Sequence, residues 1–402
     1  MKVLHVLYQS LPTKVGSTIR SRDILMSQKN AGIEVLAVTS PFQDSESYSK
    51  KIEIINGISY YRCLKINAKE TVGEKPKSFI RQVFKVFKII SFSRLIYNIS
   101  KNEKVDIIHA HSTFFSGLAA SVAAKRLKVP FVYEVRSLWE EHRVVVKASL
   151  KNKLQASFIR FLENQTIKRA DRVIVLNKEL KENLVKRGFK PEKFDLILNA
   201  VNILMVPSEK LIKRENDELT FGYIGSIITI EGLSLLIDCI HSLQDKSVKL
   251  LIFGAGSQKG ELEKILDTQN ITNVFFKGEV SSDEVYKAYN QIDVIVNPRI
   301  SNKITNDVTP LKPLEAMAYK KLVIASDVGG MKEIITHNYN GLLFKAEDKE
   351  DLLKKICEVC DNGLLHYNYL IDNASEFIKT EKSWSTNAIK YKDIYTTLLK
   401  EK

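Results

Sequence analysis

Residues 2–39, KVLHVLYQSLPTKVGSTIRSRDILMSQKNAGIEVLAVT, hold the pattern that decides the fold. The apolar run Lys2–Tyr8 predicts a strand, and a loop rich in Pro, Gly, Ser and Thr follows at Leu11–Thr18. A helical pattern then covers residues 19–31, and a second strand is expected at Glu34–Thr39. A strand, a helix and a strand in this order form a β-α-β unit, and such units build parallel sheets.

The same alternation continues through the rest of the chain. In the first half it predicts further strands at Val105–Ala110, Phe131–Val135, Arg172–Leu176 and Asp195–Leu198, with helices at Phe115–Arg126 and Leu150–Lys168. In the second half it predicts strands at Thr220–Ile224, Lys249–Phe253, Val274–Phe276, Val294–Val296 and Leu322–Ala325, again separated by helical patterns. Repeated units of this kind are typical of a doubly wound parallel sheet.

A chain of 402 residues is long enough for two such domains. The polar segment Glu209–Glu218 lies between the halves and is the best linker candidate. We therefore expect an α/β protein with two Rossmann-like, doubly wound domains facing a cleft, residues 1–205 and 206–384. A terminal helix at residues 385–402 either packs back on the first domain or ends the second.

Composition and charge narrow the class of protein. Apolar residues make up 44% and charged residues 27% of the chain, which is typical of a globular protein. The sequence has no run near the roughly 18 to 20 apolar residues of a membrane span and no signal peptide, so a cytoplasmic protein is expected. No nucleic-acid motif accompanies the net charge of +14, which favours an anionic membrane or a phosphate as partner. Four cysteines without a framework spacing are expected to be reduced thiols, although a metal or redox role stays open for Cys357 and Cys360.

The densest group of functional residues is the stretch 297–318, NPRISNKITNDVTPLKPLEAMA. A strand ends here, a polar loop follows, and Pro313 and Glu315 suit the first turn of a helix. At such a switch the exposed amides and the helix dipole can hold a phosphate. The Glu315 carboxylate can accept two ribose hydroxyls, and Asp307, eight residues earlier, can reach the hydroxyls of a sugar. A plainer interpretation makes Glu315 a helix-dipole partner and Asp307 a turn former.

The spacing Asp307-x7-Glu315 before Ala-Met-Ala resembles the donor site of family 4 of the retaining glycosyltransferases. Further segments carry the resemblance: DIIHAH at 106–111, ADRVI at 170–174, NAVN at 199–202, GS at 225–226, and SDVGG at 326–330 with Glu333. The segment PLKPLE at 310–315 is similar to the corresponding segment in the teichuronic-acid and exopolysaccharide branch of this family. The resemblance implies a GT-B fold, a nucleoside-diphosphate sugar as donor, retention of the anomeric configuration, and no metal or other cofactor.

By the same resemblance, Glu315 binds the ribose and Asp307 the transferred sugar. Many relatives carry an Arg and a Lys where this chain has Ser226 and Glu231. Negative charge grows on the leaving diphosphate, so Arg299, Lys303 and Lys312 are the candidates for the cations that it needs. The predicted catalytic residues are Asp307, Glu315, Arg299, Lys312 and Arg136. The predicted donor-binding residues are Gly225, Ser226, Gly254, Gly256, Arg299, Lys303, Asp307, Thr309, Pro310, Leu311, Lys312 and Glu315.

The first domain supplies candidates for an acceptor site. Gly16 and Ser17 let the backbone approach a ligand, and His109 and His111 lie at the carboxyl end of a strand, where α/β sheets bind ligands. Arg136 stands where many relatives have a His near the reacting sugar. The full predicted set is Gly16, Ser17, Arg20, His109, His111, Glu134, Arg136, Trp139 and Glu140. An ion pair within the fold explains the charged members of this set almost as well.

The stretch Lys75–Lys104 interleaves basic and apolar residues and has no acid before Glu103. A helix of this kind can lie on an anionic bilayer with its cations at the headgroups. It would bring the protein to a lipid-linked acceptor on the inner face of the plasma membrane. The alternative is a core helix whose lysines are simply exposed.

These patterns together predict a glycosyltransferase that moves a sugar from a nucleotide sugar to a glycan or lipid-linked acceptor, in cell-surface polysaccharide biosynthesis. Two alternatives stay open. The departures at Ser226 and Glu231 would suit a catalytically silent nucleotide- or glycan-binding protein. The glycines of Gly254-Ala255-Gly256 resemble a dinucleotide site of an NAD-dependent oxidoreductase, although the third glycine, Gly260, is one place late.

Overall fold

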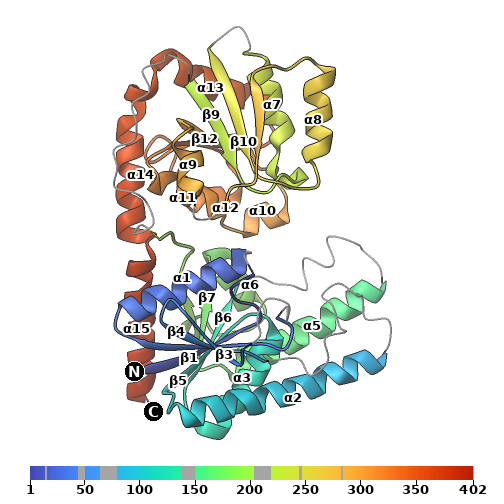
Figure 1. Ribbon diagram of the computed structural model, residues 1–402, viewed down its shortest axis with the longest axis vertical. Helices are drawn as coiled ribbons and strands as arrows, with labels where there is room; N and C mark the ends of the chain where they lie inside the picture. Colours follow the sequence, from blue (N-terminus) through green and yellow to red (C-terminus); the bar gives the residue numbers. More distant parts are fainter. Residues whose placement is uncertain are drawn as a thin grey trace. The chain divides into compact units, whose positions relative to one another are not determined.

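The computed structural model describes residues 1–13, 16–43, 50–63, 79–136, 150–202, 219–243, 247–281 and 284–401, apart from the side chains of 79–87, 150–154 and 307. It divides into two compact units, shown in Figure 1. Unit 1 comprises Met1–Leu198 and Trp384–Lys402, and unit 2 comprises Asn199–Ser383. The chain therefore passes between the units twice, and its last helix belongs to the same unit as its first strand.

The sheet of unit 1 has eight strands in the order β3-β4-β2-β1-β5-β6-β7-β8. Their bounds are β1 Lys2–Leu7, β2 Glu34–Thr39, β3 Ile52–Ile55, β4 Ile58–Tyr61, β5 Ile107–His111, β6 Phe131–Val135, β7 Arg172–Val175 and β8 Phe194–Leu196. All neighbouring strands are parallel except β3 and β4, which pair antiparallel. The expected parallel sheet is confirmed, with an antiparallel hairpin added at its edge.

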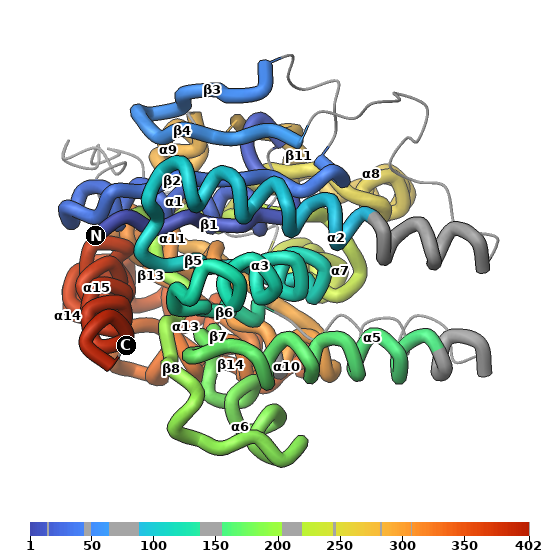
Figure 2. The backbone as a smooth tube through the Cα atoms, turned by 90° about the horizontal axis from the view of Figure 1, so that it is seen from below, coloured from blue at the N-terminus to red at the C-terminus, as the bar shows by residue number. Residues whose placement is uncertain are grey.

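Helices cover both faces of this sheet. They are α1 Gly16–Asn30, α2 Phe79–Asn102, α3 Phe114–Leu127, α5 Leu150–Arg169, α6 Lys178–Lys186 and α15 Trp384–Glu401, with a short 3-10 helix at Pro191–Lys193. Helix α3 contacts α2 and α5, and Figure 2 shows these three helices running side by side. Their core includes Phe92, Phe115 and Ala119, which pack on Leu4 and Val6 of β1. Helices α1 and α15 contact each other and cover the opposite face.

Two features of unit 1 differ from the expectations. The first helix begins at Gly16 rather than at Ile19, so the predicted backbone loop at Gly16 and Ser17 is its opening turn. The hairpin β3-β4 was not expected, although its turn, Asn56-Gly57, is a strong hairpin signal. Both turn residues have positive φ, 53° and 69°, which is the conformation that this pair of residues favours.

Unit 2 holds a six-stranded, fully parallel sheet in the order β11-β10-β9-β12-β13-β14. Its strands are β9 Leu219–Ile224, β10 Val248–Phe253, β11 Val274–Gly278, β12 Val294–Asn297, β13 Leu322–Ser326 and β14 Leu342–Phe344. Its α-helices are α7 Leu233–His241, α8 Lys259–Thr268, α9 Val285–Tyr289, α10 Lys303–Asp307, α11 Lys312–Ala318, α12 Gly329–Lys332, α13 Lys349–Asn362 and α14 Asn368–Glu381, with 3-10 helices at Thr229–Glu231 and Leu364–Tyr367. In chain order this is the 3-2-1-4-5-6 arrangement of a doubly wound fold.

Both faces of the second sheet are buried because its strands are apolar at successive positions. Val294 and Val296 of β12 point into one core, and Ile295 between them points into the other. A sheet covered on both faces needs this continuous apolar pattern. The loops at the strand ends, which escape this requirement, are left to carry polar residues.

The length and composition of the helices bear on whether they could span a membrane. Within the described part of the chain, the longer helices are all too polar to cross a lipid bilayer. Cys357 and Cys360 lie in α13 and are free thiols.

Helix α15 joins unit 1 through one face. Its buried residues are Trp384, Asn387, Ala388, Tyr391, Tyr395 and Leu398. They recur every three or four positions, which places them on one side of the helix. The terminal helix is therefore a structural part of the first unit.

Replacing Leu398, which is 4% exposed, by Ala should lower the free energy of unfolding of unit 1 by about 2–4 kcal/mol. The neighbour Leu399 is 38% exposed, and Leu399→Ala should change it by no more than about 0.5 kcal/mol. Both tryptophans of the chain, Trp139 and Trp384, belong to unit 1, so urea unfolding followed by their fluorescence measures this unit. Equal effects of the two substitutions would contradict the packing described for α15.

Candidate functional site

The carboxyl ends of β9, β10 and β12 meet at the topological switch point of unit 2. Strand β9 pairs with β10 on one side and with β12 on the other, so the loops after these strands diverge from a common edge. Open α/β sheets bind their ligands at this point. The predicted donor residues Gly225 and Gly254 follow β9 and β10 directly, and Arg299 is the second residue after β12.

Two of these loops touch each other through their backbones. The Gly225 N–H donates to the Phe253 carbonyl at 3.0 Å, and the Ile227 N–H donates to the Ala255 carbonyl at 2.8 Å. Gly254 has φ +143°, and a Cβ at this position would lie 1.8 Å from the Gly225 oxygen. Gly254 is therefore required by the packing of the neighbouring loop, whether or not a ligand is bound.

Glu315 stands in the first turn of α11, as the sequence predicted. Its Oε2 accepts hydrogen bonds from Lys312 Nζ at 2.7 Å and from the Tyr289 hydroxyl at 3.4 Å. Among the described residues its Oε1 has no partner and can accept from a ligand. Tyr289 is fully buried and stacks on Tyr319 with ring centroids 4.4 Å apart, so the carboxylate rests on a rigid base. Burial, and secondarily Glu315, raise the pKa of Tyr289 well above its ordinary value, which keeps its hydroxyl a donor.

Arg299 pairs with a residue that the sequence did not connect to it. Its guanidinium lies 3.0 Å from Glu231 Oε1, and both side chains are largely buried, 8% and 16% exposed. Glu231 reaches it because Gly232, with φ +69°, passes so close to the strand end that a Cβ would lie 2.0 Å from the Pro298 oxygen. Arg299 Nε has no hydrogen-bond partner among the described residues, which leaves a buried donor for a ligand.

Three further donor candidates, Thr309, Lys303 and Asp307, differ in their surroundings. Thr309 is 5% exposed, and its hydroxyl donates to Glu333 while its carbonyl accepts from Asn199 Nδ2 at 2.9 Å. Lys303 opens α10 at an exposed position. Asp307 ends α10, but its side chain lies outside the described part of the chain. The segment before α11 is thus partly helical rather than a loop.

The predicted phosphate site at the start of α11 stays a prediction. This helix has only 7 residues, so the field of its aligned peptide groups is small. Two of the candidate cations nearby are paired with acids, Lys312 with Glu315 and Arg299 with Glu231.

In unit 1 the sheet brings four predicted or unforeseen polar residues to one face. His5 of β1 stands opposite His109 of β5, and His111 stands opposite Glu134 of β6. Because side chains alternate along a strand, Ala110 between the two histidines points to the other face, into the apolar core. His5 was not a candidate from the sequence, because nothing in its own neighbourhood signals a site.

Glu134 is the charged centre of this face. It is fully buried and lies 3.2 Å from Arg20 Nε and 2.8 Å from Arg136 Nε. The Tyr391 hydroxyl of α15 donates to its second oxygen at 2.6 Å. Burial acts to raise the pKa of Glu134, but Arg20 and Arg136 outweigh it and hold this pKa well below the ordinary value of 4.5.

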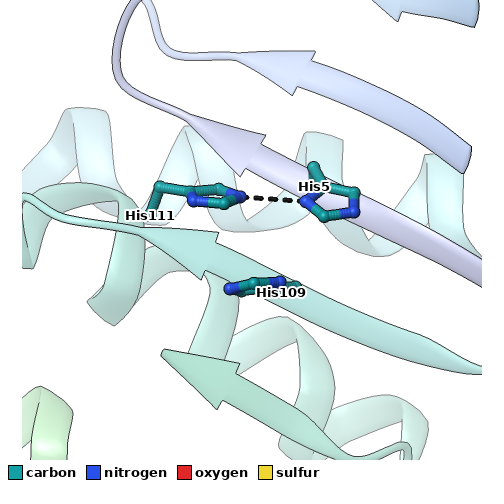
Figure 3. Close-up of side chains that lie close together, drawn as sticks. All are labelled: His5, His109 and His111. Atoms are coloured by element: carbon teal, nitrogen blue, oxygen red, sulfur yellow. Dashed lines mark hydrogen bonds between the residues drawn. The ribbon is translucent and has the colours of Figure 1, made fainter. Parts of the chain in front are cut away.

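A directed chain of hydrogen bonds runs from Arg136 through the histidines. Arg136 Nη2 donates to His111 Nδ1 at 2.7 Å, because a guanidinium only donates. His111 then carries its proton on Nε2 and donates to His5 Nδ1 at 2.9 Å, the dashed contact in Figure 3. His5 Nε2 donates in turn to Gln28 Oε1 at 3.0 Å. On the other branch the Tyr395 hydroxyl contacts His109 Nδ1 at 2.6 Å.

The histidine cluster has the geometry of a metal site but the wrong electrostatics. Ring nitrogens of His5, His109 and His111 lie within 4.8 Å of one another, although their sequence spacing gave no metal pattern. Arg20 and Arg136 already place two positive charges against the one carboxylate of Glu134. A metal cation would add to an excess of buried positive charge, which is strongly unfavourable. In this structure His5, His109 and His111 each make a hydrogen bond to another internal side chain.

The acceptor candidates of unit 1 are therefore mostly internal. Glu134, His109, His111 and Arg20 are at most 4% exposed; Arg20 and His111 lie against Glu134, and His109 bonds to the Tyr395 hydroxyl. Arg136 also donates to the Ser17 carbonyl and the Ser21 hydroxyl, at 2.7 and 2.9 Å. Gly16 and Ser17 are exposed at the start of α1, and Trp139 and Glu140 lie outside the described residues. The ion pair within the fold, left open from the sequence, is what the structure contains.

Two family models match the chain. Residues 16–203 match the one described as Glycosyltransferase Family 4, and residues 207–377 match the one described as Glycosyl transferases group 1. The two matches lie one after the other and correspond closely to the two parallel sheets.

Similar proteins extend over the chain. An uncharacterized glycosyltransferase of Methanocaldococcus jannaschii is 28% identical over 323 residues, covering 78% of this chain and 83% of that protein. Sucrose-phosphate synthase from Thermosynechococcus elongatus has a TM-score of 0.72 at 17% identity and covers 100% of both chains. HepE of Anabaena, in complex with UDP, has a TM-score of 0.70 at 14% identity and covers 99% of this chain and 100% of its own. The solved structures identify the fold as GT-B.

The buried histidines make unit 1 sensitive to acid. Burial, and secondarily His111, lower the pKa of His5 and His109 well below 6.5; burial and Arg136 lower that of His111 to about 4. As the pH falls below about 6.5, these rings become protonated in the unfolded chain but stay neutral in the folded unit. For each such ring the free energy of unfolding falls by about 1.4 kcal/mol per pH unit, until the pH reaches the pKa of that ring in the folded unit.

We expect His111→Gln to flatten this pH dependence between pH 6.5 and 4, measured by urea unfolding and tryptophan fluorescence. His366→Gln changes an exposed position of unit 2 and should leave the pH profile of unit 1 as it is. An unchanged slope in His111→Gln would show that this ring does not stay neutral in the folded unit.

Proposed function

We propose that this chain, a glycosyltransferase of the two-Rossmann-domain GT-B type, moves a sugar from a nucleoside-diphosphate donor to a hydroxyl of a glycan or lipid-linked acceptor. The observation that carries the proposal is the setting of Glu315. Its carboxylate lies at the switch-point edge of the unit 2 sheet, is fixed by Tyr289 and Lys312, and keeps one oxygen available. A ribose with two neighbouring hydroxyls suits such an acceptor group.

Arg299 is our candidate for the donor's diphosphate. It is buried at the end of β12 and has an unpaired Nε, so an anionic oxygen would complete its hydrogen bonds. Lys312, half-exposed beside Glu315, is the second candidate. HepE of Anabaena is in complex with UDP, which supports a nucleoside diphosphate as the ligand class.

For the transfer step we propose retention of the anomeric configuration. The bond from the anomeric carbon to the diphosphate oxygen breaks, and its electron pair stays on the diphosphate. The acceptor oxygen bonds to the same face of the carbon, and its proton passes to the leaving diphosphate. Cations beside the diphosphate favour this step because they stabilise the charge that develops there. Asp307 holds hydroxyls of the transferred sugar in this proposal, and neither a metal nor a further cofactor takes part.

In this proposal unit 1 binds the acceptor, but the residues in direct contact with it differ from those expected from the sequence. The Glu134, His109, His111 and Arg20 network supports the sheet edge from inside. The exposed opening of α1 at Gly16 and Ser17 is then the candidate for direct contact with acceptor. A role in polysaccharide biosynthesis rests on the resemblance of residues 310–315 to that branch.

The alternatives have less support. The packing of Gly254 against Gly225 explains the glycine that suggested a dinucleotide site. A silent binding protein would keep the Glu315 site but would not cleave a nucleotide sugar.

Replacing Glu315 by Ala should weaken binding of the cognate nucleoside diphosphate about tenfold to a hundredfold, because the hydrogen bonds to a charged group are lost. Asp307→Ala should reduce turnover more than nucleotide affinity. Thermal-shift and calorimetric titrations with UDP, GDP, ADP and NAD measure the first effect, and release of nucleotide from the sugar donor measures the second. Glu350→Ala, in the first turn of α13, is the matched control.

Full activity in both site variants would refute this assignment. Stabilisation of the protein by NAD alone would move the oxidoreductase to first place, and binding without any donor cleavage would favour the silent protein.

The negative charge of Glu231 should weaken the binding of a diphosphate by Arg299. In Glu231→Gln the hydrogen bond to the guanidinium can persist while the neutralising charge is lost, so UDP should bind about threefold to tenfold more tightly. Uridine, which has no phosphate, should bind as before. Glu261→Gln, at an exposed position in α8, is the control. Tighter binding of uridine as well would mean that the substitution acts on the nucleoside pocket instead.

A further inference from the structure

The outer layer of unit 1 formed by α2, α3 and α5 has an unusual charge pattern. Helices α2 and α3 contain no Asp or Glu, and the one acid of α5, Glu163, is buried and accepts a hydrogen bond from the Tyr133 hydroxyl at 2.7 Å. The basic residues of the three helices are Arg81, Lys85, Lys88, Arg94, Lys101, Lys125, Arg126, Lys151, Lys153, Arg160, Lys168 and Arg169. This layer is therefore strongly positive, with no exposed acid among its described side chains.

The other long helices are of mixed charge. On the opposite face of the same sheet, α1 contains Asp23 and α15 contains Asp393 and Glu401. In unit 2, α13 alternates lysines with Glu350, Asp351 and further acids. The net charge of +14 is thus concentrated on one side of one unit rather than spread evenly.

The same layer exposes large apolar side chains. Phe158 and Phe161 of α5 are 58% and 55% exposed, Val122 of α3 is 53% exposed, and Ile90 of α2 is 46% exposed. Phe158 and Phe161 are three positions apart and so lie on one side of their helix. Ala156 and Ile167 of the same helix are buried, so the two aromatic rings are turned away from the core.

We propose that the α2-α3-α5 layer is a docking surface for an anionic lipid bilayer. Aromatic rings and aliphatic side chains enter the boundary between headgroups and acyl chains, and Lys and Arg beside them meet the anionic headgroups. The three helices lie side by side, so the surface can meet a flat partner with several helices at once. This binding goes beyond the proposed reaction and does not depend on which sugar is transferred.

The arrangement fits a bilayer better than a protein partner. The core of a protein interface is depleted of charge, especially of Lys. Here three of the four exposed apolar residues have basic residues close to them in the sequence: Phe161 follows Arg160, Val122 precedes Lys125 and Arg126, and Ile90 lies between Lys88 and Arg94. A lipid surface tolerates this mixture because cations and apolar groups bind at different depths.

The structure also shifts the emphasis of the sequence expectation. The stretch Lys75–Lys104 was expected to be the membrane helix, but residues 75–78 and the side chains of 79–87 lie outside the described part of the chain. Helix α5, which the sequence placed only as a part of the fold, carries the two most exposed aromatic rings among the described side chains of the layer.

The test is co-sedimentation of the full chain with vesicles of phosphatidylcholine alone and with about one third phosphatidylglycerol added. We expect binding to the anionic vesicles only, weakened by salt as the screening length falls. Phe158→Ser with Phe161→Ser should reduce it about tenfold or more, because two rings no longer insert. Phe275→Ser, which removes a 41% exposed ring from unit 2, is the matched control and should leave binding unchanged.

A second variant, Lys168→Gln with Arg169→Gln, keeps the rings and removes two cations, and it should reduce binding to anionic vesicles alone. Equal binding to both kinds of vesicle, or an equal loss in the Phe275 control, would overturn the proposal. So would a change of oligomeric state in Phe158→Ser with Phe161→Ser, which would assign the surface to a second copy of the chain. Release of vesicles by competing RNA, without sensitivity to the two phenylalanines, would assign it to nucleic acid.

Discussion

The buried carboxylate of Glu134 is the constraint on which unit 1 depends. A carboxylate without solvent is tolerated only when it is paired and fully hydrogen-bonded, and here Arg20, Arg136 and Tyr391 surround it. Removing one partner from a buried pair costs about 3–5 kcal/mol, which is a large fraction of the stability of a domain. The three partners come from α1, from the end of β6 and from α15, so this one charge joins the beginning and the end of the chain.

The second unit handles charge differently. Two of its ion pairs, Arg299 with Glu231 and Lys312 with Glu315, lie in the segments that follow strands β9 and β12 rather than under the sheet. Each pair joins a cation to a carboxylate at the edge where the proposed donor would bind. A ligand can therefore enter by exchanging partners, which the enclosed network around Glu134 does not allow. The enclosed network around Glu134 lies in unit 1, and the two ion pairs near the proposed donor site lie in unit 2. This separation agrees with a support role for the network and a binding role for the ion pairs.

The two faces of the unit 1 sheet also differ in the residues that they carry. The face toward α1 and α15 holds the polar network, whereas the face toward α2, α3 and α5 is apolar inside and basic outside. Because the strands alternate, His109, Ala110 and His111 serve both faces at once. Opposite properties at neighbouring positions of one strand follow from this alternation.

The sequence by itself determined the two parallel sheets, the position of Glu315 in the first turn of α11, and the absence of acid in α2, because hydrophobic period, helix signals and composition are local properties. Tertiary structure alone decided that His5 joins His109 and His111 from a strand about a hundred residues away. It also decided that Glu231 meets Arg299 and that α15 closes over Glu134. These contacts depend on strand order and on loops that approach within one atomic diameter, and no residue pattern along the chain encodes either of them.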